Sequence, residues 1–325
     1  MVAAVGWFLL GLVLLLVGGR LLVAASVDTA RRLRVSPLVV GLTLVAWGTS
    51  APELALNLVS AAKGRGELAL GNVVGANVCN IALVVGCCAL IRPLFVQERL
   101  IRVEVRLCAL MLCFLAAIGL TGGIQRWEPA LLLFAFGLYS MWTVMAALRQ
   151  GDAAHAPETT LGEDPTHEGP PMGWVLIAAA FAGGLALLAG GGSFASDGAT
   201  AIALGLGVDP AVVGVTVVSI GTTMPELVTG ILAVRRGQTD LALGNAIGSC
   251  MFNAGAIFSI TALMAPPTID AALKLPLGYM AVLAIALIPI TRTFGRTVSR
   301  IEGLVLLGSY AAFLATSAWI AARAE

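Results

Sequence analysis

The sequence predicts an all-α integral membrane protein of ten transmembrane helices, arranged as two inverted five-helix repeats. The 325 residues are 59% hydrophobic and 11% charged, with a mean hydropathy of +0.96. Soluble domains carry about 25% charged residues, so this chain lacks the polar surface for water. Residues 41–80 also align without a gap with residues 214–253, and sixteen of the forty positions are identical. Long apolar runs, rather than short alternating segments, favour helices over a β-barrel.

Ten apolar segments are each near or above the roughly 20 residues that a spanning helix needs. Their approximate limits are 4–26, 36–62, 68–91, 104–123, 127–148, 173–194, 209–234, 240–265, 275–291 and 302–321. The polar stretch 149–172 holds both histidines and several acids and prolines, and is too short and polar to bury a core. We therefore expect a first repeat unit over 1–148, a flexible linker over 149–172 and a second repeat unit over 173–325.

The basic residues predict the orientation in the membrane. Most of the 19 arginines and lysines follow spans one, three, five, seven and nine, and basic loops favour the cytoplasmic side. Both termini should lie outside and the linker in the cytoplasm, in a multi-pass protein of the cell (inner) membrane. The apolar run from Val5 is too long for the core of a cleavable signal peptide, so the first helix should remain.

The two aligned segments should run through the membrane in opposite senses, because five spans, an odd number, separate them. The shared positions are mostly polar residues and glycines, which chance similarity between apolar helices would not match. They include Gly48 and Gly221, Thr49 and Thr222, Pro52 and Pro225, Glu53 and Glu226, and Asn80 and Asn253. Inverted repeats with a site near the midplane are the architecture of many secondary transporters.

Each copy places a carboxylate in an apolar span, at a cost of roughly 2.5–3.5 kcal/mol on insertion scales, which marks a functional site. Helical spacing puts neighbouring oxygen donors on the same face as the carboxylate. These faces comprise Ala46, Thr49, Ser50 and Glu53 in the first copy, and Ser219, Thr222, Thr223 and Glu226 in the second. Pro52 and Pro225 cannot donate to the helix, so each span should bend beside its carboxylate and free backbone carbonyls.

The following span of each copy adds a second polar face. It comprises Asn72, Ala76 and Asn80 in the first copy, and Asn245, Ser249 and Asn253 in the second. An all-oxygen site with two carboxylates suits a hard cation, and Ca²⁺ accepts 6–8 oxygens in flexible geometry. The two carboxylates repel when empty, so Na⁺ or protons are alternative occupants. Two ions that compete for one set of charges are the requirement of an antiporter.

With these residues, the chain resembles the cation/calcium antiporter superfamily, and most closely the prokaryotic sodium/calcium exchangers. The resemblance rests on Gly-Thr-Ser-Ala-Pro-Glu at 48–53 and Gly-Thr-Thr-Met-Pro-Glu at 221–226, each followed by Gly-Asn-x-x-Gly. It implies ten helices with both termini outside, Ca²⁺/Na⁺ exchange by alternating access, and sliding of helices one and six. It also implies that Ca²⁺ binds Glu53 and Glu226 with oxygens of Thr49 and Thr222. The implied Na⁺ ligands, besides the glutamates, are Ala46, Ser50, Ser219, Thr223 and Ser249.

The chain departs from its relatives at two positions. Many relatives read Gly-Ser-Asn in both repeats, whereas Ala76 here lacks the hydroxyl that a Na⁺ site would use. Some relatives carry an aspartate where this chain has Asn253, facing Asn80. Calcium binding should survive both changes, and the alternative reading is a proton-driven Ca²⁺/cation exchanger on the same fold.

Other functions are disfavoured by composition. A net charge of +1 argues against nucleic acid, and no protein partner is predicted, so the expected partners are inorganic cations and the lipid bilayer. No cofactor is expected, because the six cysteines form no C-x-x-C pair and no histidine lies in a span. An intramembrane enzyme would need a nucleophile with a base or a metal centre. A passive channel is disfavoured by the inverted repeat.

Overall fold

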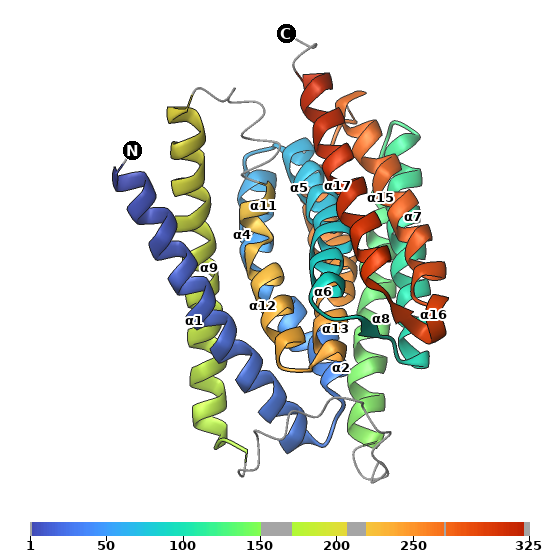
Figure 1. The fold of residues 1–325 in the computed structure, drawn as a ribbon. Coiled ribbons are helices and arrows are strands. Elements are labelled where there is room, and N and C mark those ends of the chain that lie inside the picture. The colour runs from blue at the N-terminus through green and yellow to red at the C-terminus, as the bar shows by residue number, and fades with distance from the viewer. Residues whose placement is uncertain (1, 151–170, 207–218, 270, 322–325) are drawn as a thin grey trace.

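The computed structural model describes residues 2–150, 171–206, 219–269 and 271–321. This part of the chain is almost entirely helical (Figure 1). Most of the expected linker and the first ten residues of the expected seventh span, from 209, lie outside the described residues. The expected linker over 149–172 therefore stays a prediction.

The first half contains five helical rods, several of them built from consecutive segments. They are α1 (Val2–Leu33); α2 (Pro37–Val40), η1 (Gly41–Val45), α3 (Ala46–Thr49) and α4 (Ala51–Ala62); α5 (Gly66–Val78), η2 (Cys79–Val84) and α6 (Val85–Ile91); η3 (Leu100–Glu104) and α7 (Val105–Leu120); and α8 (Trp127–Gln150). The segments labelled η are π-helical, with a wider turn than the α-helix.

The second half repeats this order within its described residues. Its helices are α9 (Trp174–Gly205); α11 (Ser219–Thr222) and α12 (Met224–Arg235); α13 (Thr239–Phe252), η5 (Asn253–Phe258) and α14 (Ser259–Met264); α15 (Ala271–Ile290); the short turn α16 (Thr293–Arg296); and α17 (Arg300–Ala321). The π-helical segments η2 and η5 start one residue apart in the alignment of the two copies. The local geometry of the copies is therefore alike.

Seven of the described helices are long and apolar enough to cross a membrane, or up to eight if the bent pair Pro37–Thr49 and Ala51–Ala62 is one span. The expectation of a helical membrane protein is confirmed. The count of ten spans, and their inversion, stay predictions. The start of α1 and the end of α17 lie at one end of the bundle, and the end of α8 and the start of α9 lie at the other (Figure 1).

Helices α1 and α9 are longer than expected and pair along their length at one edge of the bundle (Figure 1). Each has 32 residues, or about 48 Å at 1.5 Å per residue, against a hydrocarbon core of about 30 Å. The expected ends at 26 and 194 follow the apolar runs. The helices continue beyond them through polar residues such as Asp28 and Asp197, because polar side chains do not stop a helix.

Glycines on both helices bring the backbones of α1 and α9 into contact. A Cβ at Gly18 would lie 2.8 Å from the carbonyl oxygen of Gly184, and a Cβ at Gly184 would lie 2.9 Å from that of Gly18. Such small-residue interfaces let helices associate in lipid, where apolar burial alone offers no advantage.

The core lies between α13 and the first half of the second span. Helix α13 packs against α2, η1 and α3, and a Cβ at Gly244 would approach the carbonyl oxygen of Leu38 to 2.7 Å. A Cβ at Gly41 would approach the carbonyl oxygen of Leu241 to 2.7 Å in return. This close approach of the two copies sets the distance between the polar faces that they carry.

A short two-stranded antiparallel ribbon links two connections between helices. Strand β1 (Leu94–Phe95) pairs with β2 (Thr297–Val298), with Leu94 opposite Val298. The ribbon joins the connection after α6 to the connection before α17, two segments far apart in the sequence.

The α1–α9 interface predicts opposite effects for two adjacent glycines. A Cβ at Gly191 would meet the backbone nitrogen of Leu15 at 2.8 Å, whereas a Cβ at Gly190 would meet nothing within 4 Å. Gly191→Ala should therefore destabilise the protein by roughly 1–3 kcal/mol through overpacking. Gly190→Ala should be neutral or stabilising by up to roughly 1 kcal/mol, because alanine favours the helix. Thermal unfolding in detergent measures both, and equal melting temperatures would contradict the close approach.

Candidate functional site

In both copies the helix breaks two residues before the proline, at aligned positions. The second span bends by 45° between α3 and α4, and Ser50 at the break has φ −86° and ψ 7°. Thr223 takes nearly the same conformation, φ −89° and ψ 2°, between α11 and α12. The expected bend beside the carboxylate is confirmed in the first copy, and in the second copy the helix breaks at the aligned residue, Thr223. In each copy the glutamate then lies in the first turn of the new helix, where the helix dipole favours a negative charge.

The glycines of the two motifs let α9 approach these breaks. A Cβ at Gly221 would lie 2.3 Å from the hydroxyl oxygen of Ser196, and a Cβ at Gly48 would lie 2.9 Å from the side chain of Leu185. A Cβ at Gly192 would lie 3.4 Å from the carbonyl oxygen of Gly221. Helix α9 therefore touches both copies at the point where their helices break.

Glu226 is paired with a hydroxyl from the other copy. Its side chain is 1% exposed, and Ser50 Oγ donates a hydrogen bond of 2.9 Å to Glu226 Oε1. The second oxygen, Oε2, has no hydrogen-bond partner among the described residues. The structure therefore brings the two expected faces together, and half of the Glu226 carboxylate is available to a cation.

Glu53 is buried without any side-chain partner. It is 2% exposed, and neither of its carboxylate oxygens has a hydrogen-bond partner among the described residues. The two glutamates are close enough to interact electrostatically. An unpaired buried charge is costly, and buried charges are ordinarily paired or bind metal ions. Together the glutamates offer three unpaired carboxylate oxygens within one buried region.

The backbone carbonyl of Ala46 is a second meeting point of the copies. Ser249 Oγ and Thr49 Oγ1 each lie 3.5 Å from the Ala46 oxygen. Thr49 Oγ1 also lies 3.3 Å from Asn245 Oδ1 on α13. All four residues are fully or almost fully buried. The expected donors Ala46, Thr49 and Ser249 thus form one cluster of oxygens.

The remaining expected residues lie on the same elements but not all reach the carboxylates. Thr223 is buried and hydrogen-bonds with the Cys79 thiol. Thr222 is half-buried in α11, of which Ser219 is the first residue. Asn80 and Asn253 are buried, yet neither forms a hydrogen bond with Glu53 or Glu226 within the described residues. Asn80 Oδ1 and both polar atoms of Asn253 have no partner there.

Asn57, which the sequence analysis does not name, and Asn245 of the second polar face also belong to the site by geometry. Asn57 is fully buried, and its Nδ2 donates a 2.7 Å hydrogen bond to the backbone oxygen of Glu53. Asn245, fully buried, accepts from Thr49. The sequence signal for Asn57 was available, because it lies four residues after Glu53 on the same helical face. It has no polar counterpart in the second copy, where Gly230 stands at the aligned position.

A cleft of about 250 Å³ leads towards the helix breaks. It is lined by Pro52, Leu56, Ala189, Gly192, Ser193, Ser196, Asp197, Gly221, Thr222 and Pro225. Ser193 and Asp197 are exposed, whereas Gly221 and Pro225 are buried. The cleft therefore connects the surface beside α9 with the motifs of both copies, and Asp197 places a negative charge at its outer part.

Comparison with known proteins identifies the family. The family model of the sodium/calcium exchanger protein matches residues 3–145 and 176–319. The chain belongs to the sodium/calcium exchanger family. Members of this family are transporters rather than enzymes, and the chain is a membrane-embedded cation/Ca²⁺ antiporter.

Three relatives match over nearly the whole length of this exchanger. The putative antiporter CaxA of Alkalimonas amylolytica is 35% identical over 95% of this chain and 97% of its own. The inner membrane protein YrbG of Escherichia coli is 30% identical over 98% of both. The sodium/calcium exchanger MaX1 of Methanosarcina acetivorans is 30% identical over 94% of this chain and 96% of its own.

A solved structure has the same fold. The sodium-calcium exchanger NCX_Mj, soaked with Na⁺ and Ca²⁺, superposes with a TM-score of 0.80 and 29% identity. The match covers 97% of this chain and 98% of that protein. The resemblance inferred from the two motifs is thereby confirmed for the family and the fold.

The hydrogen bond across the copies predicts a selective effect of Ser50→Ala. Hydrogen bonds to charged groups contribute about 1.5–3 kcal/mol, and Ser50 Oγ donates to Glu226 Oε1 over 2.9 Å. Ser50→Ala should raise the Ca²⁺ concentration that gives half of the thermal stabilisation of the purified protein by at least about tenfold. Thermal unfolding across a Ca²⁺ titration measures this.

Ser60→Ala is the matched control. Ser60 lies on α4, the helix that follows Ser50, and its hydroxyl donates to the backbone oxygen of Leu56. Its Ca²⁺ midpoint should equal that of the wild type. A Ser50→Ala midpoint as low as that of Ser60→Ala would show that the contact with Glu226 does not matter for the cation.

Proposed function

We propose that the protein exchanges Ca²⁺ for Na⁺ across the membrane by alternating access, with the ions bound near the midplane between two inverted repeats. The observation that supports it is the meeting of two buried glutamates, one from each copy, whose oxygens remain largely unpaired among the described residues. The hydroxyls of Ser50 and Thr49 hydrogen-bond with Glu226, and the carbonyl oxygen of Ala46 lies 3.5 Å from Thr49 Oγ1. This donor set fits the 6–8 oxygen ligands of Ca²⁺.

In this proposal Glu53 and Glu226 neutralise one Ca²⁺, and Thr49 and Thr222 add oxygens. The Na⁺ ligands are the glutamates with the oxygens of Ala46, Ser50, Ser219, Thr223 and Ser249. Asn80 and Asn253 form the polar wall behind the ions. Asn80 Oδ1 and both polar side-chain atoms of Asn253 have no hydrogen-bond partner among the described residues. Ca²⁺ and Na⁺ then cannot occupy the site at the same time, because both ions use the same two charges.

The repeat units in this proposal are residues 1–148 and 173–325, joined by a linker over 149–172. Both termini lie outside and the linker lies in the cytoplasm of the cell membrane. The cleft beside α9 then opens outwards, since Asp197 lies towards the end of α9 that is far from the linker. Sliding of the α1–α9 pair against the breaks at Gly48 and Gly221 would close this cleft and open an inner one.

A proton-driven Ca²⁺ exchanger is the second candidate. It is favoured by Ala76, which is buried and has no hydroxyl at the position aligned with Ser249. A Na⁺ site that used both positions would lose one oxygen here. Carboxylates can exchange Ca²⁺ for protons without that oxygen.

Counterflow in proteoliposomes distinguishes the two candidates. With the pH clamped on both sides, an outward Na⁺ gradient should drive uptake of radioactive Ca²⁺, because Na⁺ replaces Ca²⁺ at the shared glutamates. Glu53→Gln and Glu226→Gln should each reduce this uptake at least about 100-fold, since a buried cation that loses one of its charged partners is left uncompensated, at a cost of about 3–5 kcal/mol. Uptake driven only by a pH gradient would contradict Na⁺ coupling.

Glu67→Gln is the control for the glutamate substitutions. Glu67 lies in the first turn of α5, where its side chain is exposed and accepts a hydrogen bond from Thr268. This variant should transport like the wild type. Wild-type exchange in Glu53→Gln or Glu226→Gln, with correct insertion, would contradict the proposed site.

A further inference from the structure

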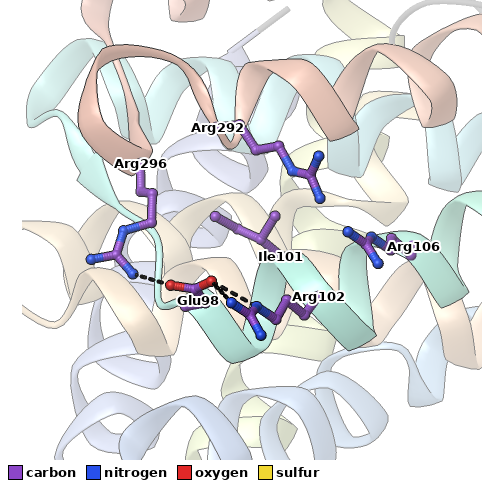
Figure 2. A pocket seen from close by; sticks show the side chains of 6 residues that line it. All are labelled: Glu98, Ile101, Arg102, Arg106, Arg292 and Arg296. Atoms are coloured by element: carbon purple, nitrogen blue, oxygen red, sulfur yellow. Dashed lines mark hydrogen bonds and ion pairs between the residues drawn. The ribbon is translucent and has the colours of Figure 1, made fainter.

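An arginine-rich cavity lies away from the glutamates, beside the β1–β2 ribbon. Its volume is about 430 Å³, and it is lined by Glu98, Ile101, Arg102, Arg106, Arg292 and Arg296. Figure 2 shows that four guanidinium groups from two segments surround the same space. Arg102 and Arg106 come from η3 and α7, and Arg292 and Arg296 come from the connection between α15 and β2.

The ribbon holds these two segments together. The backbone nitrogen of Val96 donates a 2.8 Å hydrogen bond to the oxygen of Arg296, whose guanidinium lies 5.6 Å from the Phe95 ring centroid. Phe294 and Arg296 have left-handed φ values of 45° and 66°, a region that side chains disfavour. The walls of the cavity are thus connected by backbone contacts, and Arg292 and Arg296 flank this tight turn.

The cavity holds more positive charge than its own carboxylate can pair. Glu98 accepts hydrogen bonds from Arg102 Nε at 2.6 Å and from Arg296 Nη1 at 2.9 Å. The bond from Arg102 and the charges of Arg296 and Arg292 lower the pKa of Glu98, which stays ionised. The side chains of Arg106 and Arg292 form no hydrogen bond or ion pair within the described residues. Uncompensated like charges in one cavity attract an anion.

The cavity lies where lipid-facing helices end. Arg292 follows the end of α15 at Ile290 by two residues, and Arg106 lies in the first turn of α7. Large apolar side chains beside these arginines are exposed, with Phe294 69% exposed and Leu110 66% exposed. Guanidinium groups next to exposed apolar side chains at the end of a span match the border between headgroups and acyl chains.

We propose that this cavity binds the phosphate group of an anionic phospholipid, with Arg106 and Arg292 as its main ligands. Guanidinium groups bind phosphate through two parallel hydrogen bonds, and the cavity has room for one headgroup. Phe294 and Leu110 then contact the acyl chains. Under the proposed topology the lipid belongs to the cytoplasmic leaflet. This site is separate from the transport site and does not depend on the coupling ion.

Native mass spectrometry of the purified full-length chain, titrated with phosphatidylglycerol or phosphatidylcholine, tests the proposal. Phosphatidylglycerol should bind more tightly, and Arg106→Gln/Arg292→Gln should weaken it about 30-fold, equal to about 2 kcal/mol at about 1 kcal/mol per arginine. The control Arg65→Gln/Arg126→Gln removes two exposed arginines from other loops and should bind like the wild type.

Glu98→Gln provides a test that poor folding cannot mimic. Removing the carboxylate releases Arg102 and Arg296, so phosphatidylglycerol should bind more tightly than to the wild type. Equal binding of phosphatidylglycerol to the wild type and to Arg106→Gln/Arg292→Gln would overturn the proposal. So would competition by sodium phosphate at the same concentration as the lipid, which would assign the cavity to a soluble phosphate instead.

Discussion

Two carboxylates buried in the middle of a helical bundle are the constraint on which the rest of the structure depends. Neither carboxylate oxygen of Glu53 has a hydrogen-bond partner among the described residues, and Oε2 of Glu226 has none there either. In a low-dielectric interior such charges are tolerated when a cation lies between them. The arrangement is therefore least stable when it is empty. This energetic cost couples ion binding to the conformation of the helices that carry the charges.

The surrounding helices are built to keep these charges close together and within reach of the surface. Glycines allow backbone contact between α13 and the second span, as at Gly244 and Gly41. Other glycines let α9 touch both breaks, and α9 also lines the cleft that leads to them. A transporter has to move one element relative to a fixed site. The α1–α9 pair packs on itself through small residues and meets both helix breaks through α9, and it is the element to which the proposed exchange assigns this movement.

Much of the site was accessible from the sequence because its chemistry is unusual for a membrane. A carboxylate, a proline and hydroxyls in an apolar run predicted the helix breaks found at Ser50 and Thr223, and the repeat predicted that the two faces meet. The exact partners could not be predicted. The contact of Ser50 with Glu226, rather than with Glu53, depends on the relative height of the two copies, which helical periodicity does not set.

The sequence likewise does not predict the lengths of α1 and α9 or the arginine cavity. Apolar runs report where lipid ends, whereas a helix continues until a capping or turn residue stops it, so Asp197 lay outside the expected span. In the sequence the arginines of the cavity are basic loop residues, which indicate orientation in the membrane and nothing more. Their convergence depends on the pairing of β1 with β2, two strands of two residues each, which are too short to leave a pattern.

The most direct test of the central claim is a structure of the protein determined with Ca²⁺ bound, with the ion located by its anomalous scattering. The account predicts one Ca²⁺ within about 2.3–2.6 Å of carboxylate oxygens from both Glu53 and Glu226. A Ca²⁺ ion bound elsewhere, or coordinated by only one of these glutamates, would contradict it.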